Sequence, residues 1–230
     1  GVAILHLQAK RTLEHSTSQT ATEAVRQFDL MLDNTARAAQ ELLPLAGKAC
    51  DNAVQLALRE QVTRRPFVRA TTLSWKKSIY CTSLFGDTHV SAVNPDDYVE
   101  GRLWLMNGNP VTPDTALLVY RLVEGDKAAF ASIDGYHLTN ALRLISRYAD
   151  LVLQVGPNWL GSDGKVKNSA PPEFPVAHQH LASQRYAYSV EAGMPEGEVW
   201  RYMEARYPAL FSLLVFFGVL AGVLAHWVQK

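Results

Sequence analysis

Cys50 and Cys81 are the two cysteines of this 230-residue chain, and their positions indicate a chemical role. Cys50 follows a long helical pattern, whereas Cys81 lies in S-I-Y-C-T-S-L-F-G, a stretch of strand-like composition. A bond between them would fasten a helical stem to a sheet. Closing this loop would stabilise the fold by about 3.5–4 kcal/mol in the chain-entropy model. Two buried free thiols, as in a cytosolic protein, are the alternative.

The sequence does not predict a metal centre or another cofactor. Two cysteines are too few for a zinc cage without nearby histidines, and the chain has no C-x-x-C motif. His178 and His180 form a close pair that would share one face of a strand and could then reach one metal. We expect surface-loop histidines instead, because Glu173 is the one acidic residue within ten positions.

Several other polar residues could line a ligand pocket or act as catalysts. Asp96 with Asp97, and Asp134 with Tyr136, are candidates for a pocket of the Cache kind, but loop acids and helix caps explain them equally well. Ser83 is not surrounded by a G-x-S-x-G elbow, which excludes hydrolase chemistry of that type at this serine.

The charge balance argues against nucleic acid as a partner. The chain has 22 basic and 22 acidic residues and a formal net charge of zero. Its longest basic cluster is the pair Arg64 and Arg65, which is too short for a basic patch.

The C-terminal region predicts a transmembrane helix. Residues 209–228 read A-L-F-S-L-L-V-F-F-G-V-L-A-G-V-L-A-H-W-V and contain no Asp, Glu, Lys or Arg. About 20 helical residues span the hydrocarbon core of a bilayer. Arg206 and Tyr207 flank one end and Trp227 the other, as interfacial anchors do. A buried core helix is the alternative, but such helices are usually shorter. The lipid bilayer is therefore an expected partner.

Two glycines in this span indicate contact between two copies of the chain. Gly218 and Gly222 form a G-x-x-x-G pattern, and small residues four apart let transmembrane helices approach closely. We expect a homodimer that uses this pair. The alternative is that glycine is simply common in such helices.

The two ends of the chain predict a domain held between two membrane spans. Residues 1–7 form a short apolar run, which we expect to be the end of a first transmembrane helix. We also expect a further segment beyond Lys230. A domain between two spans lies wholly on one side of the membrane, and on the periplasmic side a disulfide would persist.

The pattern between these ends predicts an α+β fold. Residues 8–43 form a helical stem, and residues 50–63 form a second, short helix. Five to seven mostly antiparallel strands with short helices between them follow. Two apolar runs joined by E-G-D-K at 124–127 form a clear hairpin. The layout, with a sensor domain at 8–194 and a connector and span at 195–230, is PAS-like or Cache-like.

The segment C-T-S-L-F-G, an upstream cysteine after a stem helix, and a following span together resemble the CSS-motif domain. That domain precedes the EAL domain of membrane-bound bacterial cyclic-di-GMP phosphodiesterases. The resemblance extends over most of residues 8–194. Thr82 departs from the serine of the family name, but it keeps the hydroxyl group.

The resemblance implies that Cys50 and Cys81 form a redox-responsive disulfide whose state is relayed through the inner membrane. It also implies a periplasmic location, thiol–disulfide oxidoreductases as partners, and a cytoplasmic EAL domain in the same chain. The full-length protein would be a cyclic-di-GMP phosphodiesterase (EC 3.1.4.52). No E-A-L or G-G-D-E-F sequence occurs in these residues, so we expect no catalysis from them.

Two other functional classes remain open. In one, the chain is a Cache-like sensor of a small ligand, and the disulfide is only structural. In the other, it is an adhesion or assembly protein anchored by its C-terminal tail.

Overall fold

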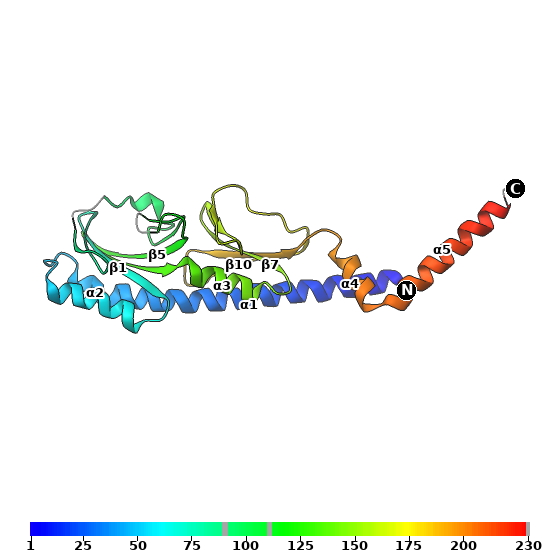
Figure 1. Cartoon of the computed structure of the whole chain (residues 1–230), viewed down its shortest axis with the longest axis horizontal. Coiled ribbons are helices and arrows are strands. Elements are labelled where there is room, and N and C mark those ends of the chain that lie inside the picture. The colour runs from blue at the N-terminus through cyan, green and yellow to red at the C-terminus, as the bar shows by residue number, and fades with distance from the viewer. Residues whose placement is uncertain (89–91, 110–111, 229–230) are drawn as a thin grey trace.

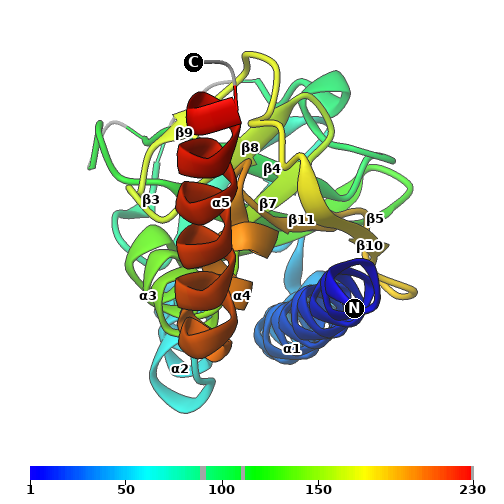
Figure 2. The ribbon, with the colours of Figure 1, turned by 90° about the vertical axis from the view of Figure 1, so that its right-hand side faces the viewer.

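Two antiparallel sheets lie one after the other along a single long helix (Figure 1). The structure, a computed structural model, describes residues 1–88, 92–109 and 112–228. Figure 2 looks along the long axis and shows helices α1, α2 and α3 on one side of the strands. The long helix therefore forms the common support of both sheets.

Helix α1 (Val2–Leu42) is one continuous helix of 41 residues. At a rise of about 1.5 Å per residue it is roughly 60 Å long. Its buried face carries small and apolar side chains at spacings of three and four, which let the helix lie close against the strands. Pro44 begins the next turn, η1 (Leu43–Leu45), and ends the regular helix. Helix α2 (Asn52–Arg64) then runs beside it.

The first sheet has six strands in the order β3-β2-β1-β6-β5-β4, and every pairing is antiparallel. The predicted hairpin is confirmed as β5 and β6, whose ladder runs from Leu117↔Asp134 to Glu124↔Lys127. A short 3-10 turn, η2 (Pro95–Asp97), precedes β4. The strands are β1 (Val68–Trp75), β2 (Ser78–Thr82), β3 (Gly86–Asp87), β4 (Leu103–Met106), β5 (Leu117–Glu124) and β6 (Lys127–Asp134).

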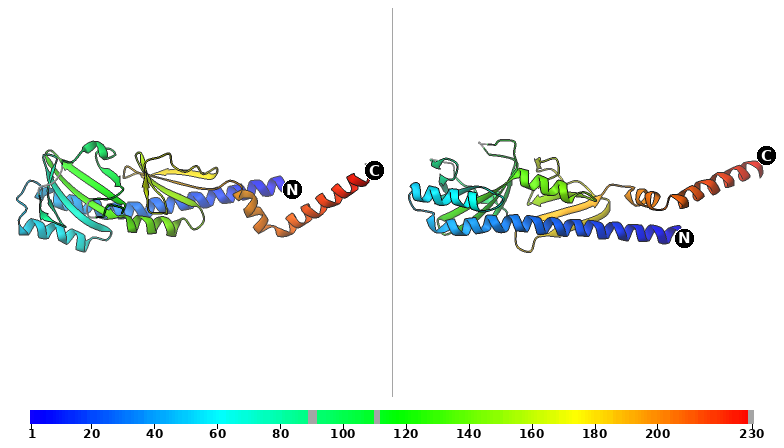
Figure 3. Two further views of the ribbon diagram at one scale, coloured as in Figure 1. Left: turned by 45° about the horizontal axis from the view of Figure 1, so that its top comes forward. Right: turned by 60° about the horizontal axis from the view of Figure 1, so that its bottom comes forward.

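The second sheet has five antiparallel strands in the order β10-β11-β7-β8-β9. Helix α3 (Gly135–Ile145) follows β6 directly and connects the two sheets. Figure 3 shows both sheets in succession along α1. The strands are β7 (Asp150–Val155), β8 (Asn158–Leu160), β9 (Val166–Lys167), β10 (Val176–Ala182) and β11 (Ser189–Met194).

Two acids of α1, the buried Asp29 and the partly exposed Asp33, attach this helix to the second sheet. Asp29 accepts hydrogen bonds from the hydroxyls of Ser183 and Tyr188, each at 2.7 Å. Asp33 accepts a bond of 2.6 Å from the hydroxyl of Tyr186 and pairs with Arg185 at 2.8 Å. Charge-assisted bonds of this kind are stronger than neutral ones, so the helix is held to the loop between β10 and β11.

The C-terminal helices return to the beginning of α1. Helix α4 (Glu198–Arg206) packs Val199 and Met203 against Ala9 and Leu13 of α1 in a separate apolar cluster. Helix α5 (Pro208–Val228) then points away from the domain with its side chains exposed (Figures 1 and 3). It is the one described helix that is long and apolar enough to cross a membrane.

The predicted fold class is confirmed: a long N-terminal helix, antiparallel sheets with short helices, and an apolar C-terminal helix. The expected number of strands was too low. The described residues form eleven strands in two sheets, because several strands have only two or three residues and show no periodic pattern. The helix expected at 8–43 begins at Val2 and is continuous with the run at 1–7.

Candidate functional site: the Cys50–Cys81 disulfide

Cys50 and Cys81 are joined in a disulfide, with their Cα atoms 5.6 Å apart. Cys50 lies in the loop between η1 and α2, and Cys81 lies on β2. The sulfur bridge therefore connects the segment that leaves α1 to an inner strand of the first sheet. Cys81 has no exposed surface, whereas Cys50 is partly exposed.

The Cys50 side of the bridge is fixed by the start of α2. Asp51 is the N-cap of this helix, and its carboxylate accepts a 2.9 Å hydrogen bond from the Val54 N–H. The Gln55 side chain turns back and donates to the Cys50 carbonyl at 3.0 Å. The cysteine is thus held between the end of one helix and the cap of the next.

A second link joins the same two segments without a covalent bond. The Tyr80 hydroxyl, on β2 beside Cys81, accepts a 2.8 Å bond from the Gly47 N–H. Burial raises the pKa of Tyr80, while the bond from Gly47 opposes that rise. Gly47 has a φ of +88°, and a Cβ there would lie 2.9 Å from the Trp75 ring. This loop geometry therefore requires glycine.

Thr82 and Ser83 shape the turn that follows Cys81. The Thr82 hydroxyl accepts a 2.9 Å bond from the Phe85 N–H. The Ser83 hydroxyl accepts a 3.0 Å bond from the Thr71 N–H, and the Ser83 N–H donates to the Thr71 carbonyl at 2.9 Å. Ser83 is buried, so it satisfies a main-chain donor of β1 that would otherwise have no partner. Cys81 thus forms the disulfide, Thr82 accepts a hydrogen bond within the following turn, and Ser83 bonds the main chain of β1 just after the end of β2.

Two large apolar side chains next to the motif are exposed to solvent. Leu84 and Phe85 are 49% and 66% exposed, and they follow Ser83 directly in the turn before β3. Leu56 of α2 is also exposed. Leu84 and Phe85 thus form an exposed apolar step in the chain directly after the motif.

The other candidate residues have structural roles or lie outside this site. Asp134 is the N-cap of α3, where it accepts from the Tyr136 N–H at 3.0 Å, and it pairs with Arg69. Asp96 and Asp97 lie in η2. These three acids do not come together in one pocket, which favours the helix-cap and loop interpretation.

The two histidines are on the surface, as expected, but they lie on a strand and not in a loop. His178 and His180 lie on β10 and share one face, and each contacts one carboxylate oxygen of Glu191 at 2.5 Å. Glu191 lies on β11, directly opposite His180 in the ladder. Glu191 is 13 residues from His178 and 11 residues from His180 in the sequence, so it lies beyond the ten positions considered for a metal partner. The pairing of β10 with β11 brings it close in space. No group of described residues has the arrangement of a metal site.

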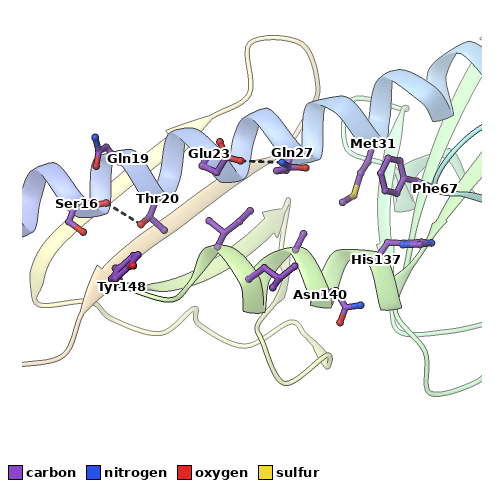
Figure 4. A pocket seen from close by; sticks show the side chains of 13 residues that line it. Ser16, Gln19, Thr20, Glu23, Gln27, Met31, Phe67, His137, Asn140 and Tyr148 are labelled. Atoms are coloured by element: carbon purple, nitrogen blue, oxygen red, sulfur yellow. Dashed lines mark hydrogen bonds between the residues drawn. The ribbon is translucent and has the colours of Figure 1, made fainter.

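A cavity of about 570 Å³ lies between α1 and α3 (Figure 4). One wall carries polar side chains of α1, including Glu23 and Gln27, which are hydrogen-bonded to each other. The opposite wall comes from His137 and Asn140 of α3 and from Tyr148, which follows this helix. None of the residues predicted for ligand binding lines this cavity.

Gly218 and Gly222 lie on the exposed α5, with open space around both. Their role in a helix–helix contact stays a prediction.

The fold and this site define the class of protein. Two antiparallel sheets follow one another along one long helix, and an apolar helix long enough to cross a membrane begins beside the start of that helix. The family model described as "CSS motif domain associated with EAL" matches residues 13–206, and the chain belongs to this family.

Two curated proteins of Escherichia coli K12 are related to the chain along most of its length. "Probable cyclic di-GMP phosphodiesterase PdeG" is 24% identical over 231 residues, which cover 100% of this chain and 45% of that protein. "Probable cyclic di-GMP phosphodiesterase PdeD" is 27% identical over 214 residues, covering 86% of this chain and 39% of that protein. The chain thus spans less than half the length of either relative.

Solved structures share the fold at low sequence identity. An extracellular ligand binding receptor from Desulfohalobium retbaense DSM5692 has a TM-score of 0.51 at 9% identity, covering 80% of this chain and 40% of that one. The extracellular domain of rpHK1S-Z16 has a TM-score of 0.50 at 12% identity, covering 87% of this chain and 99% of that one. The second match extends over almost the whole of that solved domain.

Proposed function

We propose that this chain is the sensory and membrane-anchoring part of a bacterial cyclic-di-GMP phosphodiesterase. In this proposal the Cys50–Cys81 disulfide controls signalling to a cytoplasmic EAL domain of the same polypeptide, which performs the hydrolysis. The observation that carries it is the position of the bridge, between the segment leaving α1 and the core of the first sheet. Family membership and the names of the two relatives support the enzyme class.

The continuous helix α1 offers a path from the disulfide to the membrane. Its C-terminal end leads through η1 to Cys50, and its N-terminal end packs against α4, which leads directly into α5. The bridge holds the segment that leaves α1 beside β2, so the oxidised chain is confined to arrangements in which the two cysteines are close. In this proposal reduction removes that restriction and changes how α1 and α4 pack at the membrane end.

The arrangement of the two chain ends supports a domain between two spans. The start of α1 and the start of α5 lie at the same end of the molecule (Figure 3). We propose that α5 crosses the inner membrane, that residues 1–7 continue a first span, and that the domain is periplasmic. In that compartment a disulfide persists, and thiol–disulfide oxidoreductases can act on it. The exposed Leu84 and Phe85 would receive such a partner, and α5 would pair with a second copy through Gly218 and Gly222.

The test uses the full-length protein and measures cyclic-di-GMP hydrolysis. Cys50→Ala and Cys81→Ala should each raise the output, because either change removes the bridge, and reductant should raise the output of the wild type alone. Thr82→Ser is the matched control: it alters the residue beside Cys81, keeps both the bridge and the turn hydroxyl, and should behave as wild type. If both cysteine variants hydrolysed cyclic-di-GMP at the wild-type rate, and reductant did not change the wild-type rate, redox control would be refuted.

A second candidate function is a sensor of a small ligand in which the disulfide is only structural. It is favoured by a buried, incompletely paired arginine on the first sheet, Arg121. Under this alternative, the cysteine variants would lower stability without changing the output.

A further inference from the structure

Arg121 is a buried cation on the face of the first sheet that points away from α1. On β5, Leu118 and Tyr120 belong to the core beneath the sheet, whereas Arg121 alternates to the other face. There it lies opposite Phe130 of β6 in the ladder and beneath the ring of Tyr98. Only 8% of its surface is exposed.

The guanidinium group is only partly paired. Its Nη1 donates to the Gly101 carbonyl at 3.0 Å, and its carbon lies 5.7 Å from the centre of the Tyr98 ring. Its Nε is the one fully buried side-chain nitrogen or oxygen in the described residues without a hydrogen-bond partner. No described carboxylate forms an ion pair with Arg121. The residues outside the described ranges contain no Asp or Glu.

An unpaired buried guanidinium is energetically costly, and proteins rarely leave one in this state. Removing a cation from water costs several kcal/mol unless a counter-charge and hydrogen bonds offset the loss. Burial accordingly lowers the pKa of Arg121, with only the nearby Tyr98 opposing the shift. Other arginines of the chain, such as Arg69 and Arg185, are paired with carboxylates. The position of Arg121 is therefore better suited to a counter-ion that comes from outside.

The free edge of the group defines the chemistry of that counter-ion. With Nη1 bound to Gly101, the Nε–Nη2 edge has no partner among the described residues. Two parallel N–H groups on one edge match the two oxygens of a carboxylate, which arginine binds in a bidentate manner. The Tyr98 ring over the guanidinium belongs to an aromatic group: it lies 5.4 Å from Trp104 and 6.0 Å from Phe130, between ring centres.

From these contacts we propose that Arg121 anchors a binding site for a small carboxylate whose carbon part rests against Tyr98, Trp104 and Phe130. Residues 98–103 cover the guanidinium, and within them Glu100 and Gly101 both have a positive φ, of +53° and +70°. Since Nε is sealed from water, the carboxylate enters when this segment moves outward. The site is separate from the disulfide and goes beyond the redox function.

The test measures thermal unfolding of the 230-residue chain in detergent micelles with propionate or benzoate. The corresponding amides, propionamide and benzamide, have the same shape without the charge. At least one carboxylate, at ten times its Kd, should raise Tm by about 3–5 °C, and its amide should not. Arg121→Lys keeps the charge but loses the planar fork, and should weaken binding by about tenfold or more. Arg147→Lys, the same substitution at an exposed arginine outside residues 98–103, is the matched control and should bind as wild type.

The outcomes separate a binding site from a purely structural arginine. Equal behaviour of acids and amides in the wild type at about 10 mM, ten times a Kd of about 1 mM, overturns the proposal. Undiminished binding by a folded Arg121→Lys also overturns it. If that variant does not fold, the comparison of acid with amide in the wild type still decides. If the carboxylate still binds after the Cys50–Cys81 bond has been reduced, the site does not depend on the disulfide.

Discussion

Reducing the Cys50–Cys81 bridge should lower the free energy of unfolding without abolishing the fold. The cysteines are 31 residues apart, and the chain-entropy relation gives about 3.7 kcal/mol at 25 °C for a loop of that length. The Tyr80–Gly47 hydrogen bond holds the same two segments together after reduction. The reduced chain should therefore remain folded but unfold at a lower denaturant concentration.

Urea unfolding of the chain in micelles, followed by tryptophan fluorescence with and without reductant, measures this difference. Reduction is cleaner than substitution because no side-chain atoms are lost. The Cys50→Ala/Cys81→Ala double variant serves as the control and should show no effect of reductant. A difference below about 1 kcal/mol between oxidised and reduced wild type would show that loop closure does not govern the stability of this domain.

Three further predictions concern the motif, the tyrosines and the membrane helix. Ser83→Ala should lower the free energy of unfolding by about 1–3 kcal/mol, because the buried Thr71 N–H loses its acceptor. Thr82→Ser should change it by less than about 0.5 kcal/mol. Chemical denaturation measures both values. Burial and a nearby carboxylate raise the pKa of Tyr188 above its value of about 10 in the unfolded chain. The hydroxyl of the unfolded chain therefore loses its proton at a lower pH, so the stability of the fold should decrease above about pH 10. A pH series of melting curves should show a smaller decrease in Tyr188→Phe than in the wild type, and equal slopes of stability against pH would contradict the prediction. Ile at both Gly218 and Gly222 should weaken self-association of the span in a membrane reporter assay, and unchanged association would exclude this contact.

The sequence alone was sufficient for features that depend on local periodicity or composition. Apolar residues at spacings of three and four predicted the long helix, and the uncharged run at 209–228 predicted the apolar C-terminal helix. The E-G-D-K turn between two apolar runs predicted the β5–β6 hairpin. The C-T-S-L-F-G segment with its upstream cysteine predicted the family, which the family model confirms. For the two helices and the hairpin, the signal lies within one continuous segment, where backbone geometry ties residue spacing to structure.

Only the tertiary structure decided how separate segments meet. It placed His178 and His180 against Glu191 on the next strand, and it paired Ser83 with the main chain of β1. It also divided the strands into two sheets and left Arg121 buried with a free edge. These features depend on strand register and on which face of a sheet is covered, and both result from packing between residues distant in sequence. A residue's neighbours along the chain carry no information about that packing, because burial and charge pairing depend on position in space.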